Sequence, residues 1–168
     1  MFSLKFDISK VTEWSSRYDY MDDMDIIQIG QKVKEDGYFA QEDFLKICRW
    51  KSPRTQNHTR QNSEEYIRII TEVALSTSDE RLRIEILTLL KGVDWPTASV
   101  LLHFGHTDRY PILDFRALWS LNSNVPRKGY NFDFWFEYVS YCRNLADKCE
   151  VDMRTLDQAL WAYSKVNQ

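Results

Sequence analysis

The chain has 168 residues, of which 43% are hydrophobic and 28% charged, and its net charge is −3. This length suits one domain or two small subdomains flanking a cleft, and the composition excludes a disordered or fibrous chain. The mild acidity excludes nucleic-acid binding through bulk charge, so such binding would need a local basic patch.

Cysteine usage and the apolar pattern bear on the compartment. The three cysteines have no C-x-x-C spacing, which indicates neither a zinc site nor a redox motif and favours a reducing environment. The first ten residues, MFSLKFDISK, contain no apolar run typical of a signal peptide, and no segment approaches eighteen apolar residues. We therefore expect a cytoplasmic protein with no membrane association; nothing in the sequence indicates an oligomeric state.

Two helices are predicted in the first third of the chain. Apolar residues between Ile26 and Val33 recur at helical spacing, and Gly37 supplies a helix stop. A second helix is expected to start at residues 41–43 and to run through Cys48. Pro53 then disfavours helix at Ser52, so we expect a loop there.

A basic stretch surrounds this loop. Residues 44–62 contain no acidic residue but five cations, which are Lys46, Arg49, Lys51, Arg54 and Arg60. One interpretation makes Trp50, Lys51 and Arg54 a rim that faces DNA, with Trp50 lining a pocket for a base. The other is a solvated loop with Trp50 in the core. The chain's many aromatic residues likewise either pack the core or stack on bases.

Further helix starts follow. Ser63 with two glutamates after it is typical of a helix N-terminus, and Tyr66, Ile67 and Ala74 continue at helical spacing. Residues 78–80 start the next helix. A buried stripe is predicted on that helix from four residues, Leu82, Ile86, Leu89 and Leu90.

A tight turn follows at Lys91, Gly92 and Val93. Glycine permits a chain reversal within one or two residues, Asp94 is a good N-cap, and Pro96 is tolerated in the first helical turn. Ala98, Leu101 and Leu102 are expected to be buried on the second helix. Amides exposed at such a turn attract anions, of which phosphate is the commonest.

Residues 90–98, LKGVDWPTA, resemble the helix-hairpin-helix of the HhH-GPD DNA glycosylases, the endonuclease III and adenine-mismatch glycosylase superfamily, including its small bacterial members. That hairpin usually reads L-P-G-V-G-x-x-T-A, and the family places an essential aspartate seventeen residues after its threonine. Thr97 matches the threonine and Asp114 the aspartate. The resemblance is specific over residues 84–121. It implies an all-α, helix-hairpin-helix DNA glycosylase-like bundle, with the hairpin at 82–104.

The resemblance also implies site residues and exclusions. Duplex DNA with an altered base would contact the hairpin at Lys91, Gly92, Val93, Trp95 and Thr97, with Trp95 also reaching the base. Pro96 replaces the lysine that forms a Schiff base in bifunctional members, which implies a monofunctional enzyme without lyase activity. Asp94 replaces the second glycine of the hairpin. Only Cys142 and Cys149 fall near the C-terminus, so no iron–sulfur cluster, metal or other cofactor is expected.

Asp114 has two compatible roles. As the residue before an expected helix with Phe115, Leu118, Trp119 and Leu121 buried, it is an ordinary N-cap. A carboxylate kept ionised at a helix start would also stabilise the oxocarbenium-like state of N-glycosidic hydrolysis and orient a water. Arg116 is expected beside it as a phosphate contact.

The remaining segments add little chemistry. His103, His106 and Asp108 are better explained by a loop closing a helix than by a metal site. Residues 122–129 are turn-rich, and Arg127 and Lys128 there are further candidates for a backbone contact. Helices are expected from Phe132 and around Leu160. No strand-like alternation persists, which predicts an all-α fold.

These features predict a monofunctional DNA N-glycosylase in which Asp114 assists water attack on the sugar of an extruded nucleotide. Two alternatives stay open. One is a non-enzymatic helix-hairpin-helix DNA-binding module in which Asp114 is only a cap. The other is a protein-interaction subunit, which the acidity and Asp94 favour. The sequence does not identify the base.

Overall fold

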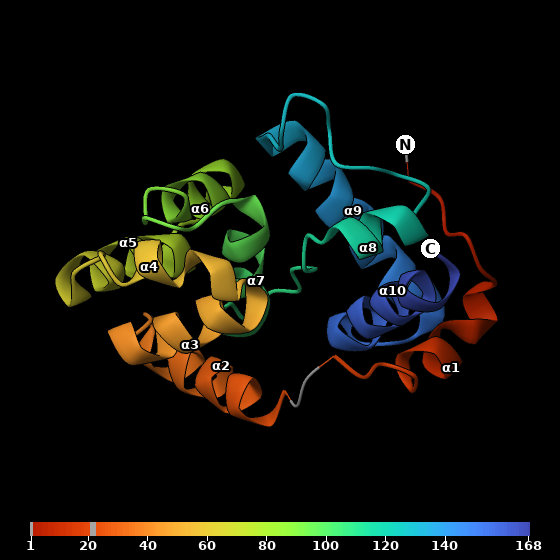
Figure 1. The fold of residues 1–168 in the computed structure, drawn as a ribbon, viewed down its shortest axis with the longest axis horizontal. Helices are drawn as coiled ribbons and strands as arrows, with labels where there is room; N and C mark the ends of the chain where they lie inside the picture. The colour runs from red at the N-terminus through yellow and green to blue at the C-terminus, as the bar shows by residue number, and fades with distance from the viewer. Residues whose placement is uncertain (1, 21–22) are drawn as a thin grey trace. The chain divides into compact units, whose positions relative to one another are not determined.

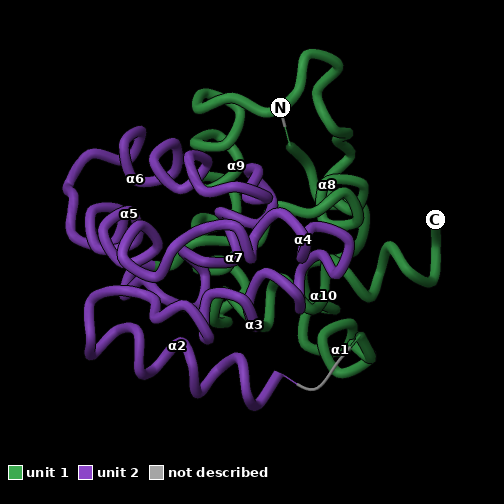
Figure 2. The backbone as a smooth tube through the Cα atoms, turned by 60° about the vertical axis from the view of Figure 1, so that its left-hand side comes forward, with its two compact units in different colours: residues 1–22, 109–168 green, residues 23–108 purple. Residues whose placement is uncertain are grey.

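The computed structural model describes residues 2–20 and 23–168, and these residues form an all-helical bundle without a β-strand (Figure 1). None of the helices in these ranges has the length and apolarity needed to cross a bilayer. The residues cluster into two compact units (Figure 2). Unit 1 comprises 1–22 and 109–168, so it is built from both ends of the chain, and unit 2 is the continuous segment 23–108.

Unit 2 contains the helical elements between residues 24 and 105. They are α2 (Met24–Asp36), α3 (Gln41–Lys51), the 3-10 turn η2 (Pro53–Thr55), α4 (Gln56–Thr59), α5 (Glu64–Ser76), α6 (Glu80–Leu87) and α7 (Trp95–Gly105). Helix α2 ends at Gly37, whose φ of 78° lies in the left-handed region, as its sequence predicts. Short helix α4 was not predicted, because residues 55–62 are polar throughout and lack an amphipathic period.

The caps predicted at the starts of α5, α6 and α7 are confirmed. Ser63, Asp79 and Asp94 each accept a hydrogen bond from a backbone N–H of the helix that follows. Such a bond satisfies one of the donors left without a partner at a helix start.

The buried face of α6 differs from the predicted stripe. Leu90 is buried as predicted and Ile86 is half-buried, but Leu82 and Leu89 are 44% and 59% exposed. The buried face of α6 runs instead through Arg83, Ile84 and Leu87, so Leu82 lies beside it. For Leu89 the prediction was wrong because it continued helical spacing through Leu90, whereas α6 ends at Leu87 and the chain then turns. On α7 the predicted burial of Ala98, Leu101 and Leu102 is confirmed.

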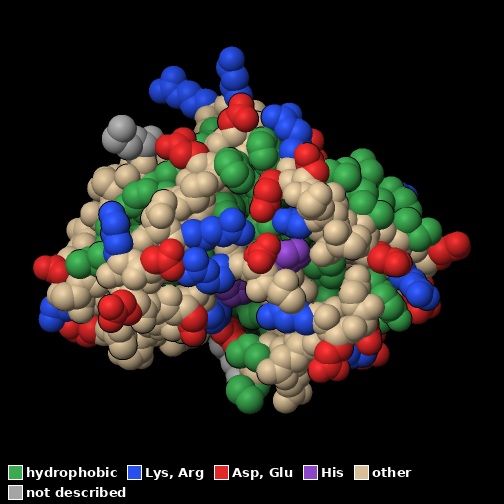
Figure 3. Space-filling model, turned by 180° about the vertical axis from the view of Figure 1, so that it is seen from behind, with side chains coloured by type: hydrophobic (Ala, Val, Ile, Leu, Met, Phe, Trp, Pro, Cys, Tyr) green, Lys and Arg blue, Asp and Glu red, His purple; other side chains and the backbone are tan. Residues whose placement is uncertain are grey.

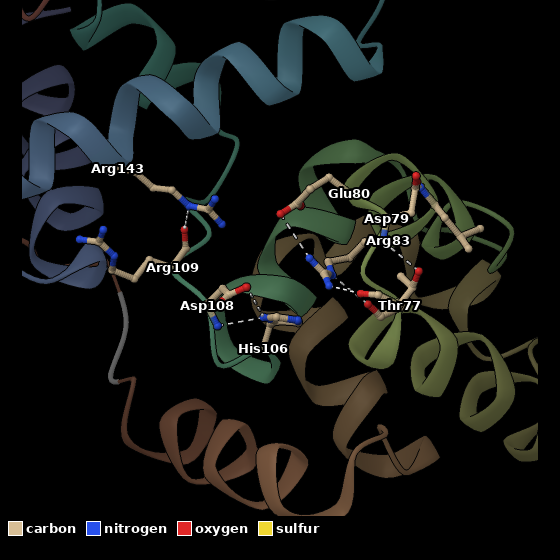
Figure 4. Close-up of polar contacts among 10 residues, drawn as sticks. Thr77, Asp79, Glu80, Arg83, His106, Asp108, Arg109 and Arg143 are labelled. Atoms are coloured by element: carbon tan, nitrogen blue, oxygen red, sulfur yellow. Dashed lines mark hydrogen bonds and ion pairs between the residues drawn. The ribbon is translucent and has the colours of Figure 1, made fainter.

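Arg83 fixes the connection from α5 to α6 (Figure 4). Its buried guanidinium donates to the carbonyl oxygens of Ala74 (3.2 Å) and Thr77, at the end of α5, and lies 3.3 Å from a carboxylate oxygen of Glu80. A cation at a helix C-terminus satisfies carbonyls that lack helical partners. The α5–α6 corner is therefore tied by one side chain.

Unit 1 contains the elements at the two ends of the chain. They are the 3-10 turn η1 (Ile8–Lys10), α1 (Val11–Ser15), α8 (Phe115–Ser120), α9 (Phe132–Cys149) and α10 (Met153–Asn167). Helix α1 packs on α10, and the extended N-terminal segment bonds to the end of α8 through Ser3 N to Leu121 O (3.1 Å) and Lys5 N to Ser120 O (3.0 Å).

Aromatic side chains fill much of unit 1. Trp135 is fully buried and stacks on Tyr110 at 5.8 Å between ring centroids, while Phe2 packs edge-on against Tyr138. Trp14 meets Tyr163 edge-on at 5.1 Å. These pairs follow the core-packing interpretation of the aromatic content, because the rings contact one another.

Candidate functional site

The turn at residues 88–93 is the first candidate region, and it lies in unit 2. Gly92 adopts φ 79°, a left-handed conformation that disfavours residues with a side chain. A Cβ on Gly92 would lie 2.8 Å from Cγ2 and 3.0 Å from the backbone N of Thr59. Two features therefore require glycine at this position, namely the left-handed backbone conformation and the close approach of the backbone to α4.

Asn62 locks this turn to the end of α4. Its buried side chain accepts from Lys91 N (2.8 Å) and donates both to Lys91 O (3.0 Å) and to Thr59 O (2.8 Å). Sequence reasoning missed Asn62, because it lies 29 residues before its partner in a polar stretch that resembles a loop. The turn and α4 consequently form one rigid surface.

Hydrogen bonding limits which amides of the turn are available to a ligand. Lys91 N is used by Asn62, Val93 N donates to Leu90 O (3.0 Å), and Trp95 N donates to the Asp94 carboxylate (2.8 Å). Within the described chain, Gly92 N and Asp94 N donate to no acceptor. An anion at this turn would therefore meet those two amides.

The other residues predicted on this hairpin are unequally exposed. Lys91 is exposed, and its Nζ lies 3.4 Å from Oε1 of Gln61. Trp95 is half-buried, but the side chains of Val93 and Thr97 are buried. Val93 and Thr97 could contribute to DNA contact only through backbone groups or by holding the turn in shape.

The predicted basic rim falls on α3 and η2. Trp50 is 8% exposed and meets Phe104 of α7 edge-on at 5.6 Å, so its ring packs in unit 2, as the second interpretation of this stretch had it. Lys51 is half-buried and Arg54 exposed. The two cations, not the tryptophan, are presented to solvent.

Asp114 is the second candidate region, and it lies in unit 1. Its half-buried carboxylate caps α8 by accepting from Arg116 N at 2.8 Å, as its position before a helix predicts. Phe115, predicted to be buried on α8, is instead 53% exposed, whereas Leu118 and Leu121 are fully buried. The six-residue helix buries only one face, and Phe115 lies off it.

The segment leading to Asp114 is braced from two helices. Ile112 N lies 3.2 and 3.3 Å from the two carboxylate oxygens of the buried Asp157 on α10, and Ile112 O accepts from the Tyr138 hydroxyl on α9 at 2.8 Å. Burial raises the pKa of Tyr138 well above its ordinary value, which keeps the hydroxyl protonated as a donor. Both backbone polar groups of Ile112, two residues before Asp114, are therefore hydrogen-bonded, which fixes the segment that leads to Asp114.

Tyr20, Arg116 and Trp161 form a cluster within unit 1, near the start of α8 that Asp114 caps. The Arg116 guanidinium lies over Phe115 at 5.2 Å and over Trp161 of α10 at 5.4 Å. Burial, and then the negative charge of Asp114, raise the pKa of the Tyr20 phenol. Sequence reasoning missed Tyr20 and Trp161, because nothing in their local sequence connects them with Asp114.

Two further regions that the sequence analysis considered are loops in the structure, namely the segment after α7 and the segment between α8 and α9. His106 is buried at the end of α7, and its Nδ1 accepts from Asp108 N at 2.9 Å (Figure 4), so it closes the helix as the loop interpretation has it. Arg127 and Lys128 are exposed between α8 and α9. No group of three or more His, Cys, Asp or Glu in the described ranges is arranged to hold a metal ion.

Charges are mixed over the surface. Acidic and basic side chains are interspersed across the face seen in Figure 3, in keeping with the small net charge. No protein-family model, curated protein or solved structure matches this chain.

Proposed function

We propose that this protein is a monofunctional DNA glycosylase that hydrolyses the N-glycosidic bond of a damaged or modified base. The observation that carries the proposal is the pairing, in one sequence motif, of a glycine turn with two available amides and a capping aspartate seventeen residues after Thr97. The amides of the turn suit a phosphate, and the aspartate suits a sugar that gains positive charge.

In the proposed reaction, the Lys91–Val93 turn holds the DNA backbone and the target nucleotide leaves the stack. The bond from the sugar C1′ to the base nitrogen breaks, and its electron pair leaves with the base. The Asp114 carboxylate stabilises the positive sugar and orients a water whose oxygen bonds to C1′. One proton of the water passes, through Asp114 or solvent, to the departing base nitrogen, and the other stays on the new C1′ hydroxyl, leaving an abasic site and a free base.

Arg116 and Tyr20 have supporting roles in this proposal. Arg116 supplies a cation beside Asp114 that suits a flanking phosphate. A protonated Tyr20 phenol offers a neutral donor near the carboxylate. Pro96 has no side-chain amine, so the proposal includes no Schiff base with the sugar.

The test is base release from duplexes that carry a panel of altered bases, read as strand cleavage by alkali at abasic sites. Asp114→Asn is the informative variant, because asparagine is as good an N-cap as aspartate and should preserve α8. We expect base release to be lost while duplex affinity persists. Unchanged release in this variant, or no release by the wild type from any duplex, would contradict the enzymatic proposal.

Two results identify the alternatives. Salt-dependent duplex binding without base release would indicate a DNA-binding module in which Asp114 is a cap. An absence of any salt-dependent DNA binding would favour a protein-interaction subunit, in line with the carboxylate of Asp94 at the turn.

A further inference from the structure

A shallow groove lies between α3 and α4, at the part of unit 2 that also holds the turn. Its volume is about 150 Å³. The residues that line it are Glu42, Leu45, Lys46, Arg49, Gln56 and Arg60. Figure 1 shows the two helices next to one another. Leu45 is the only apolar residue in this lining, and the other five residues are polar or charged.

The groove carries an excess of positive charge. Lys46 Nζ lies 2.8 Å from the Glu42 carboxylate, which offsets one cation. Arg60 Nη2 lies 3.3 Å from the neutral amide oxygen of Gln56, so its contact orients the guanidinium without cancelling its charge. Arg49 is exposed and forms no ion pair with any described residue. Two guanidinium groups therefore lie uncompensated on one groove.

Two guanidinium groups on a polar groove are suited to phosphate. Each presents a planar set of N–H donors that matches the oxygens of a phosphodiester, with stronger hydrogen bonds than neutral donors give. The two guanidinium charges disfavour a cationic ligand. The ligand class is thus a phosphate or phosphodiester anion.

The groove is mechanically connected to the turn. Asn62 bonds the end of α4 to Lys91, and Gly92 lies against Thr59, so α4 carries Arg60 on a segment fixed to the hairpin. Lys91 Nζ contacts Gln61, which directly follows Arg60. A polymer with regularly repeated phosphates could contact both places on this one unit.

We infer that the α3–α4 groove, through Arg49 and Arg60, is a second phosphate contact for a duplex DNA backbone, in addition to the turn. This inference rests on the proposed function only in taking duplex DNA as the partner, and it does not require base release. It also accounts for how an acidic chain would hold DNA, because the contact is local and not due to net charge.

The experiment measures binding of a labelled duplex by fluorescence anisotropy from 50 to 200 mM salt. The double variant Arg49→Gln/Arg60→Gln is compared with Lys34→Gln/Arg81→Gln, which removes the same charge from exposed residues on α2 and α6. We expect about tenfold weaker binding for the groove variant. The slope of log affinity against log salt should fall by about 0.9 for one lost phosphate contact. The control should stay near the wild type.

Each outcome bears separately on the two proposals. Equal affinity and slope for the groove and control variants would overturn the groove contact, even if base release proceeds. Weakened binding in the groove variant alone supports it, even if no base is ever released and the proposed activity fails. If millimolar inorganic phosphate stabilised the wild type against thermal unfolding while no duplex binding was measurable, the groove would be a site for the free anion. That result would overturn the inference.

Discussion

Asn62 bonds Lys91 through both backbone polar groups of that residue, accepting from its N–H and donating to its carbonyl. A single amide side chain thus satisfies both backbone polar groups of this residue, as a neighbouring strand does in a β-sheet. Because the side chain is also buried, its loss would leave the N–H and the carbonyl of Lys91 without this partner, while Thr59 O would keep only the 3.3 Å bond from Asn62 N.

Asn62→Ala should therefore destabilise unit 2. We expect a loss of about 2–4 kcal/mol in the free energy of unfolding, because buried polar groups left unpaired cost about 1–3 kcal/mol each and partly regain water. Urea unfolding measures it. Asn57→Ala, at an exposed position of α4, is the control and should change stability by less than about 0.5 kcal/mol. Equal effects of the two variants would contradict the locking role of Asn62.

Gly92→Ala and Gly37→Ala form a matched pair. Both glycines have φ near 80°, so both variants carry a backbone penalty of about 1–2 kcal/mol. A Cβ at Gly37 meets nothing within 4 Å, whereas one at Gly92 would press on α4. We expect Gly92→Ala to be the more destabilising in urea unfolding and also to weaken duplex binding. Equal losses of stability in the two variants would show that α4 can move away from the added methyl group without a cost in free energy.

The three cysteines should report the opening of each unit. Burial raises the pKa of the Cys48 and Cys142 thiols strongly, and that of the half-buried Cys149 as well. We expect a thiol reagent at pH 8 to modify Cys149 first, because the thiolate must be both formed and accessible. Cys48 lies in unit 2 and Cys142 in unit 1. Mass spectrometry of their labelling in rising urea would show whether the two units unfold together; fast labelling of Cys48 in the native protein would contradict its burial.

The Arg109–Asp147 pair gives a prediction in pH. Arg109 Nη1 lies 2.5 Å from Asp147, and this hydrogen bond holds the pKa of Asp147 below its ordinary value of 3.8. A lowered pKa in the folded state adds stability that is fully present above pH 3.8 and is lost as pH falls through the folded-state pKa. Asp147→Asn should lower stability at pH 6 but not at pH 2.5. Salt at 1 M should shrink the difference, since it shortens the screening length to about 3 Å.

Tyr138→Phe tests the bracing of the segment before Asp114. The variant keeps the ring and removes the hydroxyl, which donates to Ile112 O and also hydrogen-bonds with the Cys142 side chain, so a stability loss of about 1–2 kcal/mol is expected. If the proposed activity holds, kcat for base release should fall while duplex affinity is kept. Tyr66→Phe, at an exposed position of α5, is the control.

Features set by neighbouring residues could be predicted from the sequence. The caps at Ser63, Asp79, Asp94 and Asp114 follow from short polar side chains directly before apolar helices. The exposed Leu89 could not be predicted, because α6 ends at Leu87 and the side chains after that point no longer follow helical spacing.

Long-range contacts were beyond sequence reasoning for a different reason. Asn62 acts on Lys91, and Asp157 acts on Ile112 from 45 residues away. Each partner is chosen by packing, and neither carries a local signature. The turn and the candidate aspartate were thus predicted, but what holds each in place was not.

The division of the chain also has a consequence for biosynthesis. Unit 2 is one uninterrupted segment, whereas α1 of unit 1 packs on α10, which is translated after unit 2. During translation, unit 2 can form its core before α10 has been synthesised, so α1 then has no helix to pack on. The emerging N-terminal aromatic residues, Trp14 among them, would then be the surface that a chaperone meets first.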